Sequence, residues 1–202
     1  MNPKLLLCLA LILGGDCHAA IVYPKAPDGG RQMVSKNLDP DSDAKFLGVS
    51  RIEDLTVADP YENYYVELTN LASGKFLSAV KSNGYWTYPL LHGTNAVGAA
   101  GLSADDKTGK ALDFDSLEQS PFADETLEAL RMAEQLPQIK KQDYEVRRLD
   151  MPWILFRAVW LHGKSDDIII PLGTTFGRWN ALQPYSESEL VKLLQPEAKK
   201  KL

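Results

Sequence analysis

Beyond its first twenty residues the sequence has no cysteine. Both cysteines, Cys8 and Cys17, lie in that first stretch, so the remainder of the chain can neither form a disulfide nor use a cysteine nucleophile. The chain also lacks any Asn-x-Ser/Thr acceptor for N-glycosylation. These absences exclude the disulfide-stapled class of small secreted domains and agree with a bacterial rather than a eukaryotic exported protein.

The sequence has no hydrophobic run long enough to span a bilayer, which takes roughly 20 apolar residues. The longest run, residues 5–13, follows Lys4 and is followed by the small residues Ala19 and Ala20. A charged start, a short apolar middle and a small-residue exit are typical of a secretory signal peptide. We therefore expect cleavage after Ala19 or Ala20 and a periplasmic or secreted protein. Cys17 also suggests a lipoprotein, but the charged Asp16 before it disfavours lipid attachment.

Basic charge is not concentrated anywhere in the chain. There are 27 acidic and 22 basic residues, a net charge of −5, and residues 39–62 are strongly acidic. Phosphate neutralisation by clustered Lys and Arg dominates nucleic-acid affinity, so we expect no nucleic-acid partner. A hydrophobic content of 45% and a charged content of 24% are those of an ordinary globular protein.

The composition along the chain predicts four segments. Residues 1–20 form the signal peptide, and residues 21–45, with three prolines and Gly29-Gly30, form an extended or loosely ordered leader. Residues 46–196 form a single domain, and the lysine-rich residues 197–202 form a mobile tail.

Alternating and apolar runs predict the strands. Residues 64–69 alternate, and Asn83-Gly84 between residues 76–82 and 85–91 is the sequence of a type I′ hairpin turn, which would place Lys81 opposite Trp86. Further hairpins are predicted from residues 96–103 with 111–117, and from residues 153–161 with 168–172. Residues 144–149 add another strand, and Pro171 indicates that the last strand either ends there or lies at an edge.

Two helices complete the prediction. Ser120 and Pro121 begin one that ends at Pro137, and a capping box of Ser186 and Glu189 begins another that ends at Pro196. Adjacent antiparallel hairpins without regular strand–helix alternation favour an α+β fold, with a mainly antiparallel sheet of about five to seven strands and two helices packed on it.

Catalytic motifs are scarce. His92 and His162 are the histidines outside the signal peptide, and with Asp166 they could form a hydrolytic or metal site. Neither belongs to a zinc-binding motif, and no Gly-x-Ser-x-Gly elbow is present, so exposed turn residues are the simpler interpretation. Residues 39–43 resemble the start of a calcium loop, but Ala44 and Ser50 stand where an EF-hand needs glycine and glutamate. No cofactor is expected.

Aromatic residues offer a different kind of site. Six of them could line a groove for a peptide, glycan or protein partner: Tyr85, Trp86, Tyr88, Trp153, Trp160 and Trp179. Strand alternation places about half of such side chains in the core, and Trp179, beside Arg178 in a loop, is the one expected to be exposed.

Three hypotheses for function follow. The first is an exported, non-enzymatic protein that binds a protein or another envelope component. The second is a hydrolase or metal-dependent enzyme that uses His92 and His162. The third is a subunit of an envelope machine whose leader orders only on contact.

Overall fold

The computed structural model describes residues 20–119, 121–173 and 178–202. The predicted signal peptide, apart from Ala20, lies outside these residues. So do the predicted helix cap Ser120 and residues 174–177 of the loop that precedes Arg178.

The predicted α+β class and the predominance of antiparallel pairing are confirmed. The described residues form one mixed sheet of nine strands, more than the five to seven expected, with the path β6-β5-β4-β3-β7-β8-β9. The pairs β3–β7 and β1–β7 are parallel, and the other pairs are antiparallel. The strands are β1 (Ile21–Val22), β2 (Leu55–Val57), β3 (Tyr61–Tyr65), β4 (Lys81–His92), β5 (Asn95–Ala104), β6 (Ala111–Gln119), β7 (Tyr144–Met151), β8 (Phe156–Gly163) and β9 (Asp167–Leu172).

Five α-helices pack on this sheet in the described part of the chain, where two were expected. They are α1 (Gly30–Asn37), α2 (Ser42–Leu47), α3 (Leu68–Ala72), α4 (Phe122–Ala133) and α5 (Glu187–Lys201). Short 3₁₀ turns lie at η1 (Ile52–Asp54), η2 (Leu77–Ala79), η3 (Pro137–Lys140) and η4 (Pro152–Ile154). The missed helices, α1 to α3, are at most eight residues long, too short for a sustained helical period.

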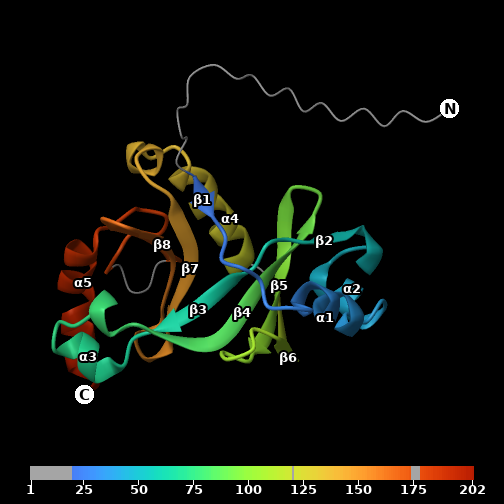
Figure 1. Ribbon diagram of the computed structural model, residues 1–202, viewed down its shortest axis with the longest axis horizontal. Helices are drawn as coiled ribbons and strands as arrows, with labels where there is room; N and C mark the ends of the chain where they lie inside the picture. Colours follow the sequence, from blue (N-terminus) through green and yellow to red (C-terminus); the bar gives the residue numbers. More distant parts are fainter. Residues whose placement is uncertain (1–19, 120, 174–177) are drawn as a thin grey trace.

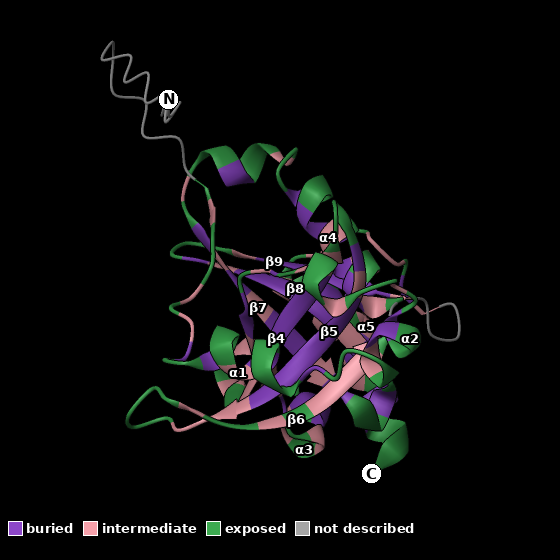
Figure 2. Cartoon of the chain, turned by 90° about the vertical axis from the view of Figure 1, so that its right-hand side faces the viewer, coloured by how far each residue is buried: buried purple, intermediate pink, exposed green. Residues whose placement is uncertain are grey.

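The helices cover different parts of the sheet (Figure 1). Helices α1 and α2 lie beside β4 to β6, and α3 and α5 pack together against β8 and β9. Helix α4 packs against Val159 of β8, whereas α3 and α5 lie in the cluster that contains the next residue, Trp160. Successive strand residues point to opposite faces, so α4 covers the face opposite to α3 and α5. Strand β5 is largely buried, β4 is buried over residues 87–90 and more exposed toward its ends, and β6 is a half-buried edge (Figure 2).

The sheet consists of two antiparallel parts joined by a parallel seam. Strands β3 to β6 form one part and β7 to β9 the other, and the seam is the pair β3–β7, with Glu62 opposite Arg147 and Tyr64 opposite Leu149. A parallel pair needs a long crossover connection. Here β4, β5, β6 and α4 all lie between the two seam strands in the sequence.

The leader is ordered, in contrast to the expectation for residues 21–45. Strand β1 pairs with β7, Asp28 forms a bridge with Lys110, and Val34 of α1 is fully buried against β4 and β5. These are contacts with distant parts of the chain, and they override the weak local pattern of a segment rich in Gly and Pro.

The prediction of a hairpin turn at Asn83-Gly84 is wrong. Strand β4 continues through this dipeptide without a break. The pairing register of β3 against β4 shifts at this point, as in a β-bulge. Gly84 has φ +69°, which a bulge accommodates as readily as a turn does. Trp86 pairs with Glu62 and Leu102, not with Lys81. The tight turn lies instead between β4 and β5, where Gly93 has φ +63°.

The other two hairpins are confirmed. Leu102 pairs with Phe114 across β5 and β6, and His162 pairs with Asp167 across β8 and β9. Strand β9 is at the edge of the sheet, as Pro171 predicts. The apolar run 153–161 divides into η4 and β8, with Leu155 between them in the left-handed region at φ +53°. The strand expected at residues 64–69 instead ends at Tyr65, before α3.

The last helix begins as predicted but continues further. The capping box of Ser186 and Glu189 is present, yet α5 passes through Pro196 and ends at Lys201, so the expected mobile tail is helical. Ala198 is fully buried in the cluster that α5 shares with α3, and this packing keeps the helix intact beyond the proline. None of the described helices is long and apolar enough to cross a membrane.

Candidate functional site

A cavity of the described part of the chain lies along the β3–β7 seam. Its volume is about 590 Å³, within the range of roughly 300–1,000 Å³ typical of small-molecule sites. We call it the seam cavity. Its charged lining residues are Glu118, Arg148, Asp150 and Arg157, and its aromatic lining residues are Tyr65, Tyr85 and Trp153.

Strand register brings the charged residues together. Asn63 of β3 lies opposite Arg148 of β7, and Asp150 lies opposite Arg157 of β8. Residues two apart on a strand share a face, so Arg148 and Asp150 point to the same side. Glu118, near the end of β6, completes the cluster from the other part of the sheet.

Arg148 is a buried cation that its neighbours satisfy incompletely. Its side chain is 7% exposed, and Nη1 donates to the Thr87 hydroxyl at 3.4 Å, which in turn donates to Asn63 Oδ1 at 3.1 Å. Nη2 lies 3.6 Å from Asp150 and 3.8 Å from Glu118, beyond hydrogen-bond length. Nε is buried and has no hydrogen-bond partner among the described residues. A buried donor left unpaired in this way calls for a specific reason.

Arg157 sits closer to solvent and binds the same carboxylates. Its Nε lies 3.2 Å from Asp150 and its Nη1 lies 4.0 Å from Glu118. The guanidinium carbon is 4.4 Å from the centre of the Phe122 ring, a cation–π contact that fixes the group from the side of α4. Two cations and two carboxylates thus form a charge-balanced cluster.

Burial dominates the titration of Asp150. Loss of solvent raises the pKa of this carboxyl above its usual value, and the positive charges of Arg148 and Arg157 oppose the shift only in part. The two arginines, of which Arg157 lies at 3.2 Å, therefore do not fully offset the desolvation of the carboxylate.

The aromatic side chains provide the remaining walls. The Tyr85 ring packs over Gly101 of β5, where a Cβ atom would overlap it, and its hydroxyl lies 2.6 Å from Ser116 Oγ. Trp153 follows Pro152 in η4 and is 50% exposed. The cavity is thus bordered by a fixed tyrosine and an accessible indole.

A neighbouring cavity of about 320 Å³ shares the Asp150 and Arg157 walls and is bounded by Phe122 and Leu155. Leu155 is 63% exposed, so an apolar side chain stands at this end of the site. The two cavities together extend the site from the seam toward the start of α4.

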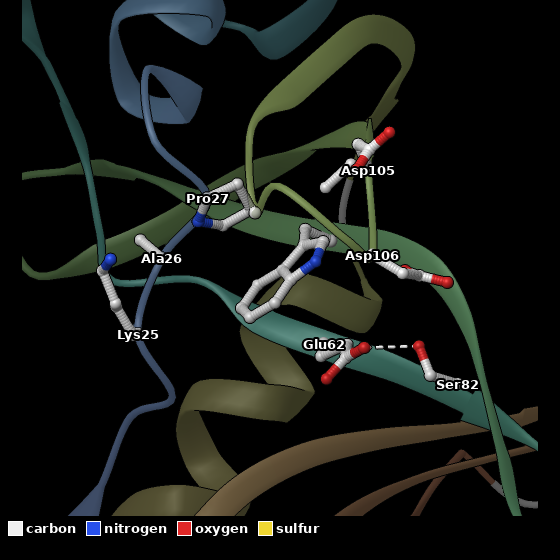
Figure 3. Close-up of a pocket in the computed structure, with 10 residues that line it drawn as sticks. Lys25, Ala26, Pro27, Glu62, Ser82, Asp105 and Asp106 are labelled. Atoms are coloured by element: carbon white, nitrogen blue, oxygen red, sulfur yellow. Dashed lines mark hydrogen bonds between the residues drawn. The ribbon is translucent and has the colours of Figure 1, made fainter.

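A separate cavity of about 280 Å³ lies between the leader and the β5–β6 turn, and Figure 3 shows it. Two of its acidic residues, Glu62 and Asp105, already have partners. Glu62 accepts hydrogen bonds from the Tyr64 hydroxyl at 2.7 Å and from Ser82, toward which it points in Figure 3. Asp105 accepts from the backbone N–H of Lys107 at 2.9 Å and of Thr108 at 2.7 Å, and the Thr108 bonds lower its pKa. The hydrogen bonds of Asp105 are those of a side chain that caps the β5–β6 turn.

The two histidines are not brought together. His92 ends β4 and His162 lies on β8, with β3 and β7 between these strands. At neighbouring-strand spacings of about 4.8 Å, the two positions are at least roughly 14 Å apart across the sheet. Neither histidine lines the seam cavity.

His162 and Asp166 have separate partners. His162 Nδ1 lies 2.8 Å from Asp167, and its ring packs edge-on against Trp160 at 5.1 Å. Asp166 instead accepts from the Tyr144 hydroxyl at 2.6 Å and from Gln142. The described residues contain no group of three or more His, Cys, Asp or Glu side chains placed to hold a metal ion.

Trp179 and Arg178 are not an exposed contact pair. Trp179 is 3% exposed and packs edge-on against Phe156 at 5.1 Å, so the expected exposure is wrong. Arg178 forms an ion pair with the largely buried Glu197 of α5. Trp179 therefore packs onto the core, which the polar character of the local sequence does not indicate.

Of the aromatic residues considered from the sequence, Tyr85 and Trp153 line the seam cavity and Trp86 lines the cavity of Figure 3. Tyr88, Trp160 and Trp179 are core residues. Sequence reasoning missed Glu118, Arg148, Asp150 and Arg157. The available signal was Arg157, a single charge inside the apolar run 153–161, because a charge in such a run needs a partner.

Comparisons with known proteins add no further information. No protein-family model matches the chain, and neither the curated proteins nor the solved structures give a significant match.

Proposed function

We propose that this chain is an exported, non-enzymatic binding protein and that the seam cavity is its ligand site. The observation that carries the proposal is a cavity of about 590 Å³ that combines a half-exposed tryptophan with an incompletely paired, buried arginine. Ligand sites typically combine apolar walls with a few convergent polar groups. The ligand could be free or a chemical group of an envelope component.

Binding is favoured over hydrolysis by the nature of the lining side chains. Neither a histidine nor a serine is among the described residues that line the seam cavity. Ser116, which contacts the lining residue Tyr85, is held by the hydroxyl of that tyrosine. A serine nucleophile hydrogen-bonded to a histidine base, one arrangement that hydrolysis by covalent catalysis uses, is thus not supported by the described lining residues.

Export rests on the signal-peptide pattern and is tested separately. We expect the protein expressed in a bacterial host to appear outside the cytoplasm with Ala20 or Ile21 as its first residue. Recovery of the intact chain from the cytosol, by intact-mass measurement, would contradict this part of the proposal.

Ligand binding is tested by a screen of small polar fragments, read from amide shifts in two-dimensional NMR spectra. We expect hits to shift residues of β3, β7 and η4 together. Trp153→Ala should abolish most of these shifts, and Phe46→Ala, which removes an exposed aromatic ring from α2, should leave them unchanged. Hits confined to other surfaces would refute the seam cavity as the ligand site.

A further inference from the structure

Three of the four cation–carboxylate distances in the seam cavity exceed hydrogen-bond length, and the fourth, from Arg157 Nε to Asp150, is 3.2 Å. Arg148 Nη2 lies 3.6 Å from Asp150 and 3.8 Å from Glu118, and Arg157 Nη1 lies 4.0 Å from Glu118. A direct hydrogen bond between such groups is about 2.7–2.9 Å long. A hydroxyl oxygen placed beside one of these pairs can accept from the guanidinium and donate to the carboxylate at the same time.

The charge balance of the cavity disfavours a charged ligand. An anion that approached Arg148 or Arg157 would also meet Asp150 and Glu118, which lie within 4.0 Å of the same guanidinium groups. A cation would meet the two arginines. Like-charge contacts of this kind select against wrong partners. A neutral molecule with several hydroxyl groups can bind donors and acceptors without either repulsion.

Arg148 also retains unused hydrogen-bonding capacity. A guanidinium has five N–H donors, and here the side chain is more than nine-tenths buried while its Nε has no partner among the described residues. Asn63, which also lines the cavity, adds an amide that is 5% exposed. The polar wall is therefore preformed and incompletely satisfied.

Aromatic side chains that line the same cavity supply flat apolar surface. Trp153 is half exposed in η4, and Tyr85 is held in place by Ser116 and by its packing over Gly101. Aromatic rings of this kind present a large rigid face at low conformational cost. A sugar ring offers the matching surface, with C–H groups on its faces and hydroxyls around its edge.

We propose that the seam cavity binds a neutral sugar residue. Its hydroxyl groups lie beside the guanidinium–carboxylate pairs that Arg148 and Arg157 form with Glu118 and Asp150, and its ring packs on Trp153. This inference rests on the proposed function, because it specifies the ligand class of the same site.

The test measures binding of defined probes to the purified protein by calorimetry and by NMR. The neutral probes are maltose, cellobiose and N,N′-diacetylchitobiose, and the charged probes are glucuronic acid and citrate. We expect at least one neutral disaccharide to bind and to shift amides of β3 and β7. Each charged probe should bind at least about ten-fold more weakly, a ratio that like-charge repulsion in the cavity can supply.

Two variants and one control variant separate the contributions. Trp153→Ala should weaken the neutral probe about ten-fold or more, the usual cost of losing an aromatic contact, and Phe46→Ala should have no effect. Glu118→Gln keeps the shape of the side chain but removes its charge. It should therefore raise the affinity for glucuronic acid relative to the neutral probe by about five-fold or more.

The outcomes distinguish the inference from the proposed function. Tighter binding of citrate or glucuronic acid than of every neutral disaccharide at the seam would overturn the sugar inference and leave the ligand site intact. Binding of charged fragments alone would likewise overturn the sugar inference and leave the ligand site intact. If no sugar, charged probe or fragment shifts seam residues, both the inference and the proposed function fail.

Discussion

Gly101 offers the sharpest test of how the wall of the seam cavity is built. A Cβ atom at this position would overlap the hydroxyl and Cζ of Tyr85 and would lie 2.7 Å from Ser116 Oγ. Gly101→Ala must therefore displace the Tyr85 ring. Overpacking of this kind costs about 1–3 kcal/mol, and loss of the Tyr85–Ser116 hydrogen bond adds about 1 kcal/mol. We expect a total destabilisation of about 2–4 kcal/mol.

The assay is urea unfolding of four proteins in a double-mutant cycle. In a Tyr85→Ala background the ring is absent, so Gly101→Ala should cost less than about 1 kcal/mol, because the Ser116 hydroxyl can rotate away. Gly98→Ala is the matched control on the same strand. Its Cβ would lie 2.5 Å from the Glu118 carbonyl oxygen, so its cost should persist in both backgrounds. An equal cost of Gly101→Ala with and without the ring would refute the packing argument.

Three further predictions concern the leader, the last helix and the buried carboxyl. Val34→Ala, at a fully buried position of α1, should lower the free energy of unfolding by about 2 kcal/mol in urea; an unchanged midpoint would mean that the leader does not contribute to the core. Deleting residues 197–202 removes the buried Ala198 and should destabilise the protein by about 2 kcal/mol by thermal unfolding, whereas a mobile tail would cost nothing. Burial raises the folded-state pKa of Asp150, so the folded state binds more protons than the unfolded state once pH exceeds about 4, and ionisation costs stability. The unfolding free energy of the wild type relative to Asp150→Asn should therefore fall as pH rises from about 4 through the raised pKa; a constant or rising difference would contradict the sign.

The parts of the fold that the sequence predicts are those with strong local signals. The hairpins β5–β6 and β8–β9 show alternation or apolar runs beside turn residues, and the capping box of Ser186 marks the start of α5. The leader gives no such signal, since α1 is held by contacts of Val34 with strands that follow it by more than fifty residues. Asn83-Gly84 misleads because a glycine at positive φ, here Gly84 at +69°, fits an irregular strand pairing as well as a hairpin turn.

The candidate site could not be predicted from local sequence patterns, for the same reason. Asn63, Thr87, Glu118 and Arg148 belong to four strands, and their proximity depends on the parallel seam, which no local pattern specifies. Two of the aromatic walls, Tyr85 and Trp153, were among the residues considered for a groove. Residue type alone could not separate them from Trp160 and Trp179, which are core.

The parallel junction also determines when the site can exist. Strands β4, β5 and β6 and helix α4 all lie between Glu62 and Arg147 in the sequence. Contacts between residues so distant in sequence form late, because closing a long loop costs conformational entropy. The local hairpins can assemble beforehand, but a chain with an undocked seam has no binding pocket. Ligand occupancy would therefore draw the final docking step toward completion, so that recognition and the last stage of folding become one linked equilibrium.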